Sequence, residues 1–304
     1  MRHLRMLTLL DRHRQTSKAA AVLNITQPAV SKALADVEAG LQIKLFDRHA
    51  RGLTPTPAGV TVIRCARLVL ATLADTGEEL DALANNNMKP IRIGALPAAA
   101  TSLIPFCLSH IKLAAPSTAV FIREASMDSL VSELRSGGIE LIVGVLSDLQ
   151  SYRDLEEEVL YNDNTVFVVR RGHELECQNK IDPARLSEYP WVMPPSQSLL
   201  GDGLADWFMN HGIPRPVNIV ETLSYSVIRH YLSITDSIAS IPSSVAIEKN
   251  WSQSFHILPF APPELKRPVG MSWYRTRPET RELKLFKDCI RDVVRRHIDK
   301  TLIV

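Results

Sequence analysis

The apolar and polar positions around residues 26–37 predict a helix with two different faces. Val30, Leu34 and Val37 recur at i, i+4 and i+7, so they share one apolar face. Thr26 favours the position before a helix, and Pro28 is tolerated in the first turn. The opposite face is polar or charged: Gln27, Ser31, Lys32 and Asp36. A short face of this kind, with a basic residue near its start, suits the major groove of DNA.

The segment before this helix predicts a helix-turn-helix. Residues 18–23 form a short helix of mostly small residues, which lets a second helix cross closely, and residues 24–26 form a tight turn. This is the plan of the motif in which the second helix reads DNA. An ordinary helical hairpin in a core has the same local pattern, so the motif alone leaves both interpretations open.

Residues 45–59 predict a basic two-stranded wing that ends where Thr and Pro start a new helix. Residues 1–56 hold nine Lys and Arg against four Asp and Glu, a net charge of +5, whereas the remainder holds 26 against 29. A basic first segment on a mildly acidic body indicates a polyanionic partner for the first segment only.

Residues 57–84 predict one long helix with an apolar stripe of heptad character. The predicted dimerisation positions on the stripe are Val62, Ala66, Val69, Leu73, Leu80 and Leu83. A lone helix would leave this stripe in water, so the simplest partner is the same helix of a second subunit. Packing of the stripe on its own domain is the alternative.

Polar residues and Pro90 break this helix at residues 85–90 and form a hinge. Beyond the hinge, short apolar strands alternate with helices, which is typical of parallel α/β units. Strands are predicted at 91–96, 119–122, 141–145, 165–169, 217–220, 237–240 and 269–274. Helices are predicted at 101–114, 127–137, 201–211, 224–233 and 279–298. The expected fold class is therefore an α+β multidomain chain.

The composition is that of an ordinary globular chain. An apolar content of 45% and a charged content of 22% over 304 residues allow two or three compact units. No apolar run reaches the length that spans a bilayer, and the first helix lacks the apolar block of a signal peptide, so no membrane partner is expected. The four Cys are scattered, which predicts a reduced, cytoplasmic protein without a structural zinc. No metal site and no cofactor are expected.

The N-terminal segments together resemble the DNA-binding domain of the LysR-type transcriptional regulators. The matching residues keep a fixed spacing: Ala19, Ala20, Leu23, Gln27, Pro28, Ala29, Val30, Ser31, Leu41, Leu45, Phe46, Arg48, Thr54, Ala58 and Gly59. The chain departs from the family at residues 14–16, where Gly, Ser and an aromatic residue are usual, and at Gln42, where Gly is common.

The resemblance implies double-stranded DNA as a partner, read by the second helix and the wing. The expected DNA-binding residues are Thr26, Gln27, Pro28, Ala29, Ser31, Lys32, Arg48 and Arg51. Gln can pair with adenine and Ala can touch a thymine methyl, while wing arginines supply contacts to the backbone or minor groove. For Arg48, an ion pair with Asp47 or a contact with a helix end is the alternative. The resemblance also favours a homodimer, a homotetramer and contact with RNA polymerase.

The α/β part resembles the effector domain of the same family, with the periplasmic-binding-protein fold of two lobes and two crossovers. The matching segments are 138–142, 172–175, 190–192 and 236–242. The expected domains are a winged helix-turn-helix at 1–56, a linker helix and hinge at 57–88, and an effector domain at 89–304. In the latter, lobe I takes about 89–162 plus 268–304, and lobe II about 163–267. Leu96 and Pro97 resemble a subgroup of regulators, like those of galactose-binding proteins, that respond to sugars or aromatic acids.

The resemblance places a small organic effector, expected to be acidic, between the lobes. The candidate effector-binding residues are Ala98, Thr101, Ser102, Ser126, Ser196, Ser198, Thr222 and Ser224. Each hydroxyl alone is as easily explained as a helix cap. Many relatives carry Ser or Thr at the position of Ala98 and Arg at the position of Gly201, so two anion anchors are missing. We therefore expect either substitute hydroxyls or a less anionic ligand.

Three other classes of protein fit the sequence less well. An enzyme is disfavoured because the chain has no Gly-rich phosphate loop, His-Glu-x-x-His or Gly-x-Ser-x-Gly string. A solute-binding protein with the same α/β fold is disfavoured by the missing export signal and the basic first segment. A DNA-binding protein without a ligand would leave the large α/β domain without a use.

Overall fold

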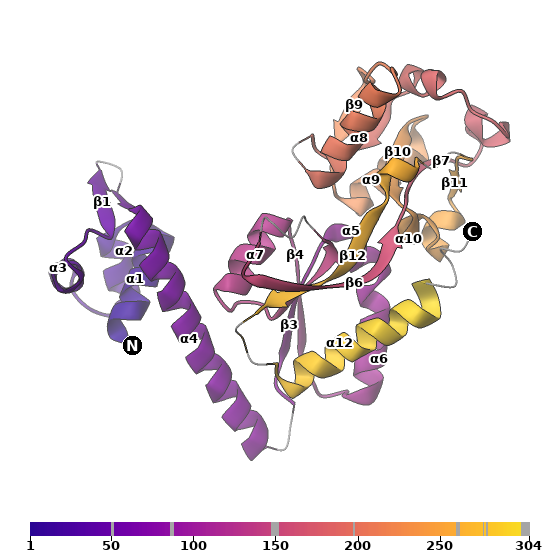
Figure 1. Cartoon of the computed structure of the whole chain (residues 1–304). Coiled ribbons are helices and arrows are strands. Elements are labelled where there is room, and N and C mark those ends of the chain that lie inside the picture. Colours follow the sequence, from indigo (N-terminus) through magenta and orange to yellow (C-terminus); the bar gives the residue numbers. More distant parts are fainter. Residues whose placement is uncertain are drawn as a thin grey trace. The chain divides into compact units, whose positions relative to one another are not determined.

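The computed structural model describes residues 1–49, 52–85, 88–146, 152–196, 198–259, 262–275, 277 and 279–298. The chain divides into two compact units (Figure 1). One comprises Met1–Lys89 with Val131–Ile139, and the other comprises Pro90–Leu130 with Glu140–Val304. The N-terminal unit is mainly helical, and the C-terminal unit contains both five-stranded sheets.

The N-terminal unit opens with three helices and a two-stranded sheet. Its elements are α1 Arg2–His13, α2 Thr16–Leu23, α3 Gln27–Leu41, β1 Phe46–His49 and β2 Gly52–Pro55. β1 and β2 pair antiparallel, so the predicted wing is present. Leu7, Leu10, Val30 and Leu34 lie in one buried cluster with Phe46. The helical hairpin and the wing therefore share one small core.

The long helix α4, Pro57–Ala84, begins at the predicted position. Its own unit covers part of the apolar stripe, so only the remainder could contact a second subunit. Ala66 is 0% exposed within its own chain, and Val62 packs against the core of α1–α3. The prediction that Ala66 lies in a contact between subunits is therefore wrong, and Val62 is half-covered by its own domain. Further along, Val69, Leu73 and Leu80 are 38%, 46% and 62% exposed. The side chain of Leu83 lies outside the described residues.

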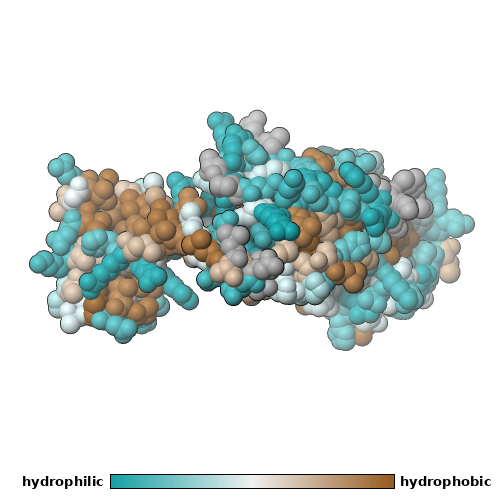
Figure 2. All heavy atoms as spheres, turned by 90° about the horizontal axis from the view of Figure 1, so that it is seen from below, coloured by the Kyte–Doolittle hydropathy of each residue, from teal (hydrophilic) through white to brown (hydrophobic). Residues whose placement is uncertain are grey.

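α4 is also long and apolar enough, by length and composition, to cross a membrane, unlike the sequence-based expectation. The difference arises because average hydropathy tolerates isolated charges in a long window. Its buried face packs on the core of α1–α3, and its Arg67 is ion-paired with Asp11 of α1. These contacts are typical of a helix that belongs to a folded domain. Figure 2 shows apolar atoms gathered on the surface of the N-terminal unit, at the left of the view.

The first sheet of the C-terminal unit has the strand order β4-β3-β5-β12-β6. Its strands are β3 Ile91–Ala95, β4 Val120–Glu124, β5 Leu141–Val145, β6 Leu155–Asp163 and β12 Arg267–Tyr274. The helices that follow these strands in the chain are α5 Pro97–Ser102, α6 Ile104–Ala114, α7 Met127–Arg135 and α12 Arg281–Val293, which a π-helical segment Val294–Ile298 extends. Residues of α7 from Val131 onward group with the first unit. Residues of α5, α6 and α12 share one buried cluster with β3, β5 and β12.

The second sheet has the strand order β11-β7-β10-β8-β9. Its strands are β7 Thr165–Arg170, β8 Trp191–Met193, β9 Ile219–Glu221, β10 Ile238–Pro242 and β11 Phe255–Ile257. The helices are α8 Leu199–Asn210, α9 Tyr225–Ile234, α10 Ser243–Ala246 and α11 Lys249–Ser252, with 3-10 turns at Glu174–Cys177, Pro183–Glu188 and Pro263–Leu265. Phe167, Trp191, Trp207 and Phe208 form an edge-on aromatic core. The chain crosses between the sheets after β6 and returns before β12.

Some predicted elements need correction. The helix predicted at 101–114 begins at Pro97 and is split, because Pro97 and Pro105 each occupy the first turn of a separate helix. The sheets are mixed rather than parallel, since β12 pairs antiparallel with β5 and β6. The sequence did not predict β6, because its three consecutive Glu residues obscure an edge strand. The strands β8 and β11 have only three residues each.

Candidate DNA-reading surface and effector cleft

The outer face of α3 is open to solvent along the predicted reading positions. Thr26, Gln27, Pro28, Ala29 and Lys32 are exposed, and Ser31 is half-buried. The inner face contains Val30 and Leu34, which are 0% and 2% exposed. Burial of the apolar face therefore fixes which side chains of α3 a groove could meet.

The turn before α3 is built by a left-handed residue. Asn24 has φ 53°, and its N–H donates to the carbonyls at the end of α2. The Gln27 amide donates to Thr16 Oγ1 over 3.2 Å, which ties the start of α3 to the start of α2. One donor of Gln27 is therefore used within the protein, and its other amide donor and its carbonyl oxygen have no partner among the described residues. These groups are the ones that adenine would need.

Glu38 on α3 is hydrogen-bonded to the chain that enters the wing. It is only 7% exposed and accepts hydrogen bonds from the Leu45 and Phe46 N–H groups at 2.8 and 3.2 Å. The Lys44 ammonium lies 2.8 Å from the same carboxylate. Burial opposes ionisation, but these donors outweigh it and hold the pKa of Glu38 below its ordinary value. Sequence reasoning missed this residue because a Glu in an exposed-looking run gives no local signal of burial.

The wing presents Arg48 to solvent. Arg48 is exposed on β1, opposite Leu53 of β2, and forms no ion pair among the described residues. The alternative of an ion pair with Asp47 is therefore not observed. Gly59 fixes the wing against α4, since a Cβ there would lie 1.9 Å from the Leu45 carbonyl oxygen. Arg51 lies outside the described residues.

A cavity of about 280 Å³ opens between the two lobes of the C-terminal unit. Three of the predicted effector residues line it, namely Ala98, Ser126 and Ser198. The other polar lining groups come from Asp128, Tyr152 and Tyr225, and the rest of the wall is mostly aliphatic. Burial raises the pKa of Tyr225 above its ordinary value, so its hydroxyl stays protonated. The cavity is small and predominantly apolar, as ligand sites usually are.

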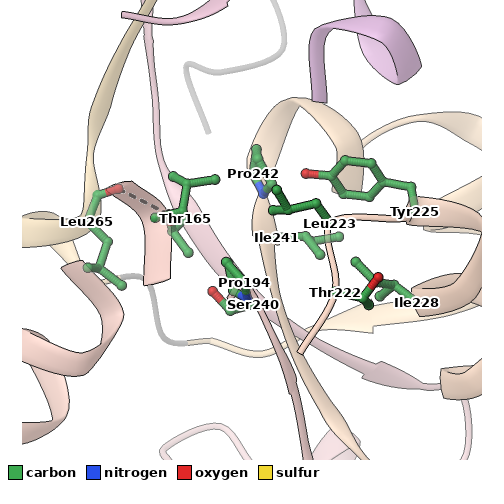
Figure 3. A pocket seen from close by; sticks show the side chains of 11 residues that line it. Thr165, Pro194, Thr222, Leu223, Tyr225, Ile228, Ser240, Ile241, Pro242 and Leu265 are labelled. Carbon is green, nitrogen blue, oxygen red and sulfur yellow. Dashed lines mark hydrogen bonds between the residues drawn. The ribbon is translucent and has the colours of Figure 1, made fainter. Parts of the chain in front are cut away.

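The other predicted hydroxyls lie elsewhere. Thr222 lines a smaller neighbouring pocket, which Figure 3 shows with Tyr225 beside it. Thr101 donates back to the Pro97 carbonyl at 2.9 Å, as expected for a helical Thr. Ser196 hydrogen-bonds Glu221 and Arg215, and Ser224 hydrogen-bonds Ser226. Thr101, Ser196 and Ser224 are not part of the cavity wall that the described residues form.

Ser102 has a different position from the one expected. It is fully buried, donates to the Ala98 carbonyl at 2.9 Å and lies 3.3 Å from Ser244 Oγ of the second lobe. The prediction that it contacts an effector is corrected, because no surface of Ser102 faces the cavity. Ser102 instead joins the lobes.

A buried carboxylate stands at the crossover between the lobes. Asp163, at the end of β6, is 4% exposed and accepts hydrogen bonds from Ser243 Oγ at 2.7 Å and from the Ser244 N–H at 3.2 Å. Burial raises the pKa of its carboxyl above the ordinary value, although the two serines act against the shift. No local pattern could indicate this cluster, since Asp163 and Ser243 are 80 positions apart.

The structure shows the surroundings of Ala98 and Gly201, the two positions where relatives often carry an anion-binding side chain. Ala98 reaches the cavity with a methyl group alone. Gly201, where relatives often have Arg, packs against the preceding loop, and a Cβ there would lie 2.0 Å from the Pro195 carbonyl oxygen. An arginine at that position would therefore require the loop to move.

A winged helix-turn-helix and a two-lobed α/β unit with a cavity between its lobes define a DNA-binding protein with a small-molecule-binding domain. Two family descriptions match the chain, "Bacterial regulatory helix-turn-helix protein, lysR family" over residues 1–60 and "LysR substrate binding domain" over residues 84–295. The chain belongs to the LysR family of transcriptional regulators.

Individual proteins agree with this assignment. The regulator GbpR of Azospirillum brasilense is 30% identical over 91% of this chain and 82% of its own length. PcaQ of Agrobacterium fabrum is 28% identical over 96% and 94%. Among solved structures, CbnR has a TM-score of 0.68 at 18% identity, covering 96% of this chain and 98% of CbnR. A full-length OxyR variant of Pseudomonas aeruginosa has a TM-score of 0.67 at 21% identity, with coverage of 95% and 96%. At these identities the structures support the fold alone.

Proposed function

We propose that this regulator reads its operator with the exposed face of α3 and the wing, and changes that contact when a small molecule binds between its lobes. The proposed DNA-contacting residues are Thr26, Gln27, Pro28, Ala29, Ser31, Lys32, Arg48 and Arg51. The observation that carries this proposal is the exposure of the polar face of α3 opposite an apolar face on which Val30 and Leu34 are buried. The proposed domain division is 1–56, 57–88 and 89–304.

We propose that the protein acts as a homodimer through α4. The exposed positions Val69, Leu73 and Leu80 form the part of the stripe that its own domain leaves uncovered. A second α4 would bury these side chains, and each fully buried Val or Leu contributes about 1.5–3 kcal/mol. By analogy with the family, the proposal also includes a tetramer and contact with RNA polymerase. It further includes a cytoplasmic location and the absence of catalysis.

The proposal is tested by footprinting the full-length protein on DNA from upstream of its own gene. We expect a protected site whose length or intensity changes when a cleft ligand is added. A variant with Lys32→Ala should show weaker protection, while Lys249→Ala, which removes another exposed charge from α11, should keep it. Equal protection of unrelated DNA, or a loss of protection by Lys249→Ala alone, would contradict the proposal.

A further inference from the structure

The described wall of the cavity between the lobes contains no lysine or arginine. Its polar side chains are Ser126, Asp128, Tyr152, Ser198 and Tyr225, so the one formal charge among them is negative. Arg267 lines a smaller adjacent cavity, where its Nη1 donates to the Glu264 and Lys266 carbonyls at 3.2 Å each, but it is not part of the larger cavity's described wall. A carboxylate effector would therefore find no cationic side chain among the described residues that line the larger cavity.

The side chains at the starts of α7 and α8 disfavour an anion in the cavity. The first turn of α7 carries Asp128, whose negative charge occupies that end of the helix. At the start of α8, Ser198 Oγ accepts from the Gly201 N–H at 3.1 Å and donates to the Pro195 carbonyl at 2.7 Å. Neither position brings a cationic side chain to the described wall for a charge-assisted hydrogen bond with a carboxylate.

The start of α5 offers no side-chain donor to the cavity. Pro97 has no N–H, Ala98 has no hydroxyl, and the Thr101 hydroxyl is turned back to a main-chain carbonyl. The described residues of α5, α7 and α8 therefore bring no cationic side chain to the cavity wall.

The same wall is well suited to a donor that carries positive charge. Asp128 is exposed to the cavity and accepts one hydrogen bond, from the Tyr152 hydroxyl at 2.8 Å. A carboxylate offers about four acceptor sites, so Asp128 has capacity for further donors. The rings of Tyr152 and Tyr225 line the same cavity and can attract a cation through their faces. The aliphatic remainder of the wall would cover an apolar body.

We propose that the effector is a small organic amine, with its ammonium group bound to Asp128 and its apolar body against the aliphatic wall. This inference rests on the proposed function, because it assumes that the cavity is the effector site. It departs from the acidic ligand expected for the family. The volume of about 280 Å³ limits the ligand to a small molecule.

Calorimetry on the full-length protein with matched probes tests the proposal. The probes are benzylamine, 2-phenylethylamine and hexylamine. Each amine is compared with an alcohol and a carboxylate that have the same apolar body and a similar size. We expect the best amine to bind at least about tenfold tighter than its matched carboxylate, as one charge-assisted hydrogen bond would give. Asp128→Asn should remove that preference, whereas Tyr152→Phe, which keeps the ring and frees an oxygen of Asp128, should retain it.

Carboxylate binding that is tighter than amine binding, unchanged amine affinity in Asp128→Asn, or no amine binding at millimolar concentration would each overturn the proposal. Operator binding, measured on the same samples, separates this failure from a failure of the proposed function. A protein that binds its operator but no amine contradicts the amine proposal alone. A protein that binds the amine but no operator contradicts the proposed function alone.

Discussion

Single buried or strained residues set the stability of the reading domain. Glu38 joins α3 to the chain that enters the wing, with hydrogen bonds from two main-chain N–H groups and from Lys44. Gln42 ends α3 in the left-handed conformation, at φ 55°. The sequence identified Gln42 as a departure from the family's Gly, but only the backbone angle shows that the departure carries a conformational cost.

Glu38→Gln should destabilise the N-terminal unit by about 1–3 kcal/mol at neutral pH, the cost of weakening buried charge-assisted hydrogen bonds. Because folding lowers the pKa of Glu38, its contribution is fully present above its unfolded pKa and is lost as the pH falls through the folded value. Hydrogen exchange of α3 amides at pH 7 and near pH 4 measures both effects. Asp36→Asn, on the exposed face of α3, is the control and should change neither. Equal effects of Glu38→Gln at both pH values would argue against stabilisation by the ionised Glu38 carboxylate.

Gln42→Gly should stabilise the same unit. A residue other than Gly in the left-handed conformation costs roughly 1–2 kcal/mol of strain, which Gly avoids. Gly loses more conformational entropy on folding, so the net stabilisation is smaller than the strain that is removed. We expect slower hydrogen exchange in α2 and α3 by several-fold. Arg14→Gly is the matched comparison, since Arg14 also has positive φ but loses an ion pair to Asp11 on substitution. Faster exchange in Gln42→Gly would show that the side chain contributes more than the backbone strain removes.

At the scale of elements, periodicity predicted the helices more reliably than the strands. The start and end of α4 follow directly from the Thr-Pro pair before it and the polar run after it. The stripe on α4 did not reveal that its first part is covered by α1–α3, because both kinds of burial demand the same spacing. Edge strands such as β6 escaped prediction because one of their faces can remain charged.

Leu73→Asp tests the exposed half of the stripe. An aspartate placed in a contact between two α4 helices would be buried without a partner, so we expect the oligomer to dissociate. Sedimentation velocity measures the change in mass. Ala74→Asp adds the same charge to an exposed neighbour off the stripe and should leave the mass unchanged. An unchanged mass in a folded Leu73→Asp protein would exclude this surface as the dimer contact.

At the scale of the whole C-terminal unit, the lobes meet at a polar cluster that no local pattern could have predicted. Asp163, Ser244 and Ser102 come from three separate elements, and Ser244 contacts both of the others. The cavity lies beside this cluster, and Tyr161 and Asp163 border its smaller neighbour. The cleft as a whole could be predicted from the family resemblance, but which hydroxyls face it could not, because the helical ones turn back to their own carbonyls.

Asp163→Asn should raise the unfolding temperature of this unit at pH 8. Folding raises the pKa of Asp163, so its stabilising contribution is complete below the unfolded value of about 3.9 and is lost as the pH rises through the folded value. Asparagine stays neutral, so its advantage should shrink as the pH falls toward 4. Tryptophan fluorescence measures the transition, because all four Trp lie between residues 191 and 273. Asp206→Asn, exposed on α8, should show no such pH dependence.

The central claim, that α3 reads DNA sequence, is tested most directly by anisotropy titrations of the full chain on its own upstream DNA and on a scrambled fragment, over a range of salt. We expect Ser31→Ala to reduce discrimination between the fragments by about 1–3 kcal/mol. Lys32→Ala should weaken binding to both and lower the salt slope by about one. Wild-type protein that binds both fragments equally, or two variants that bind like wild type, would contradict the claim.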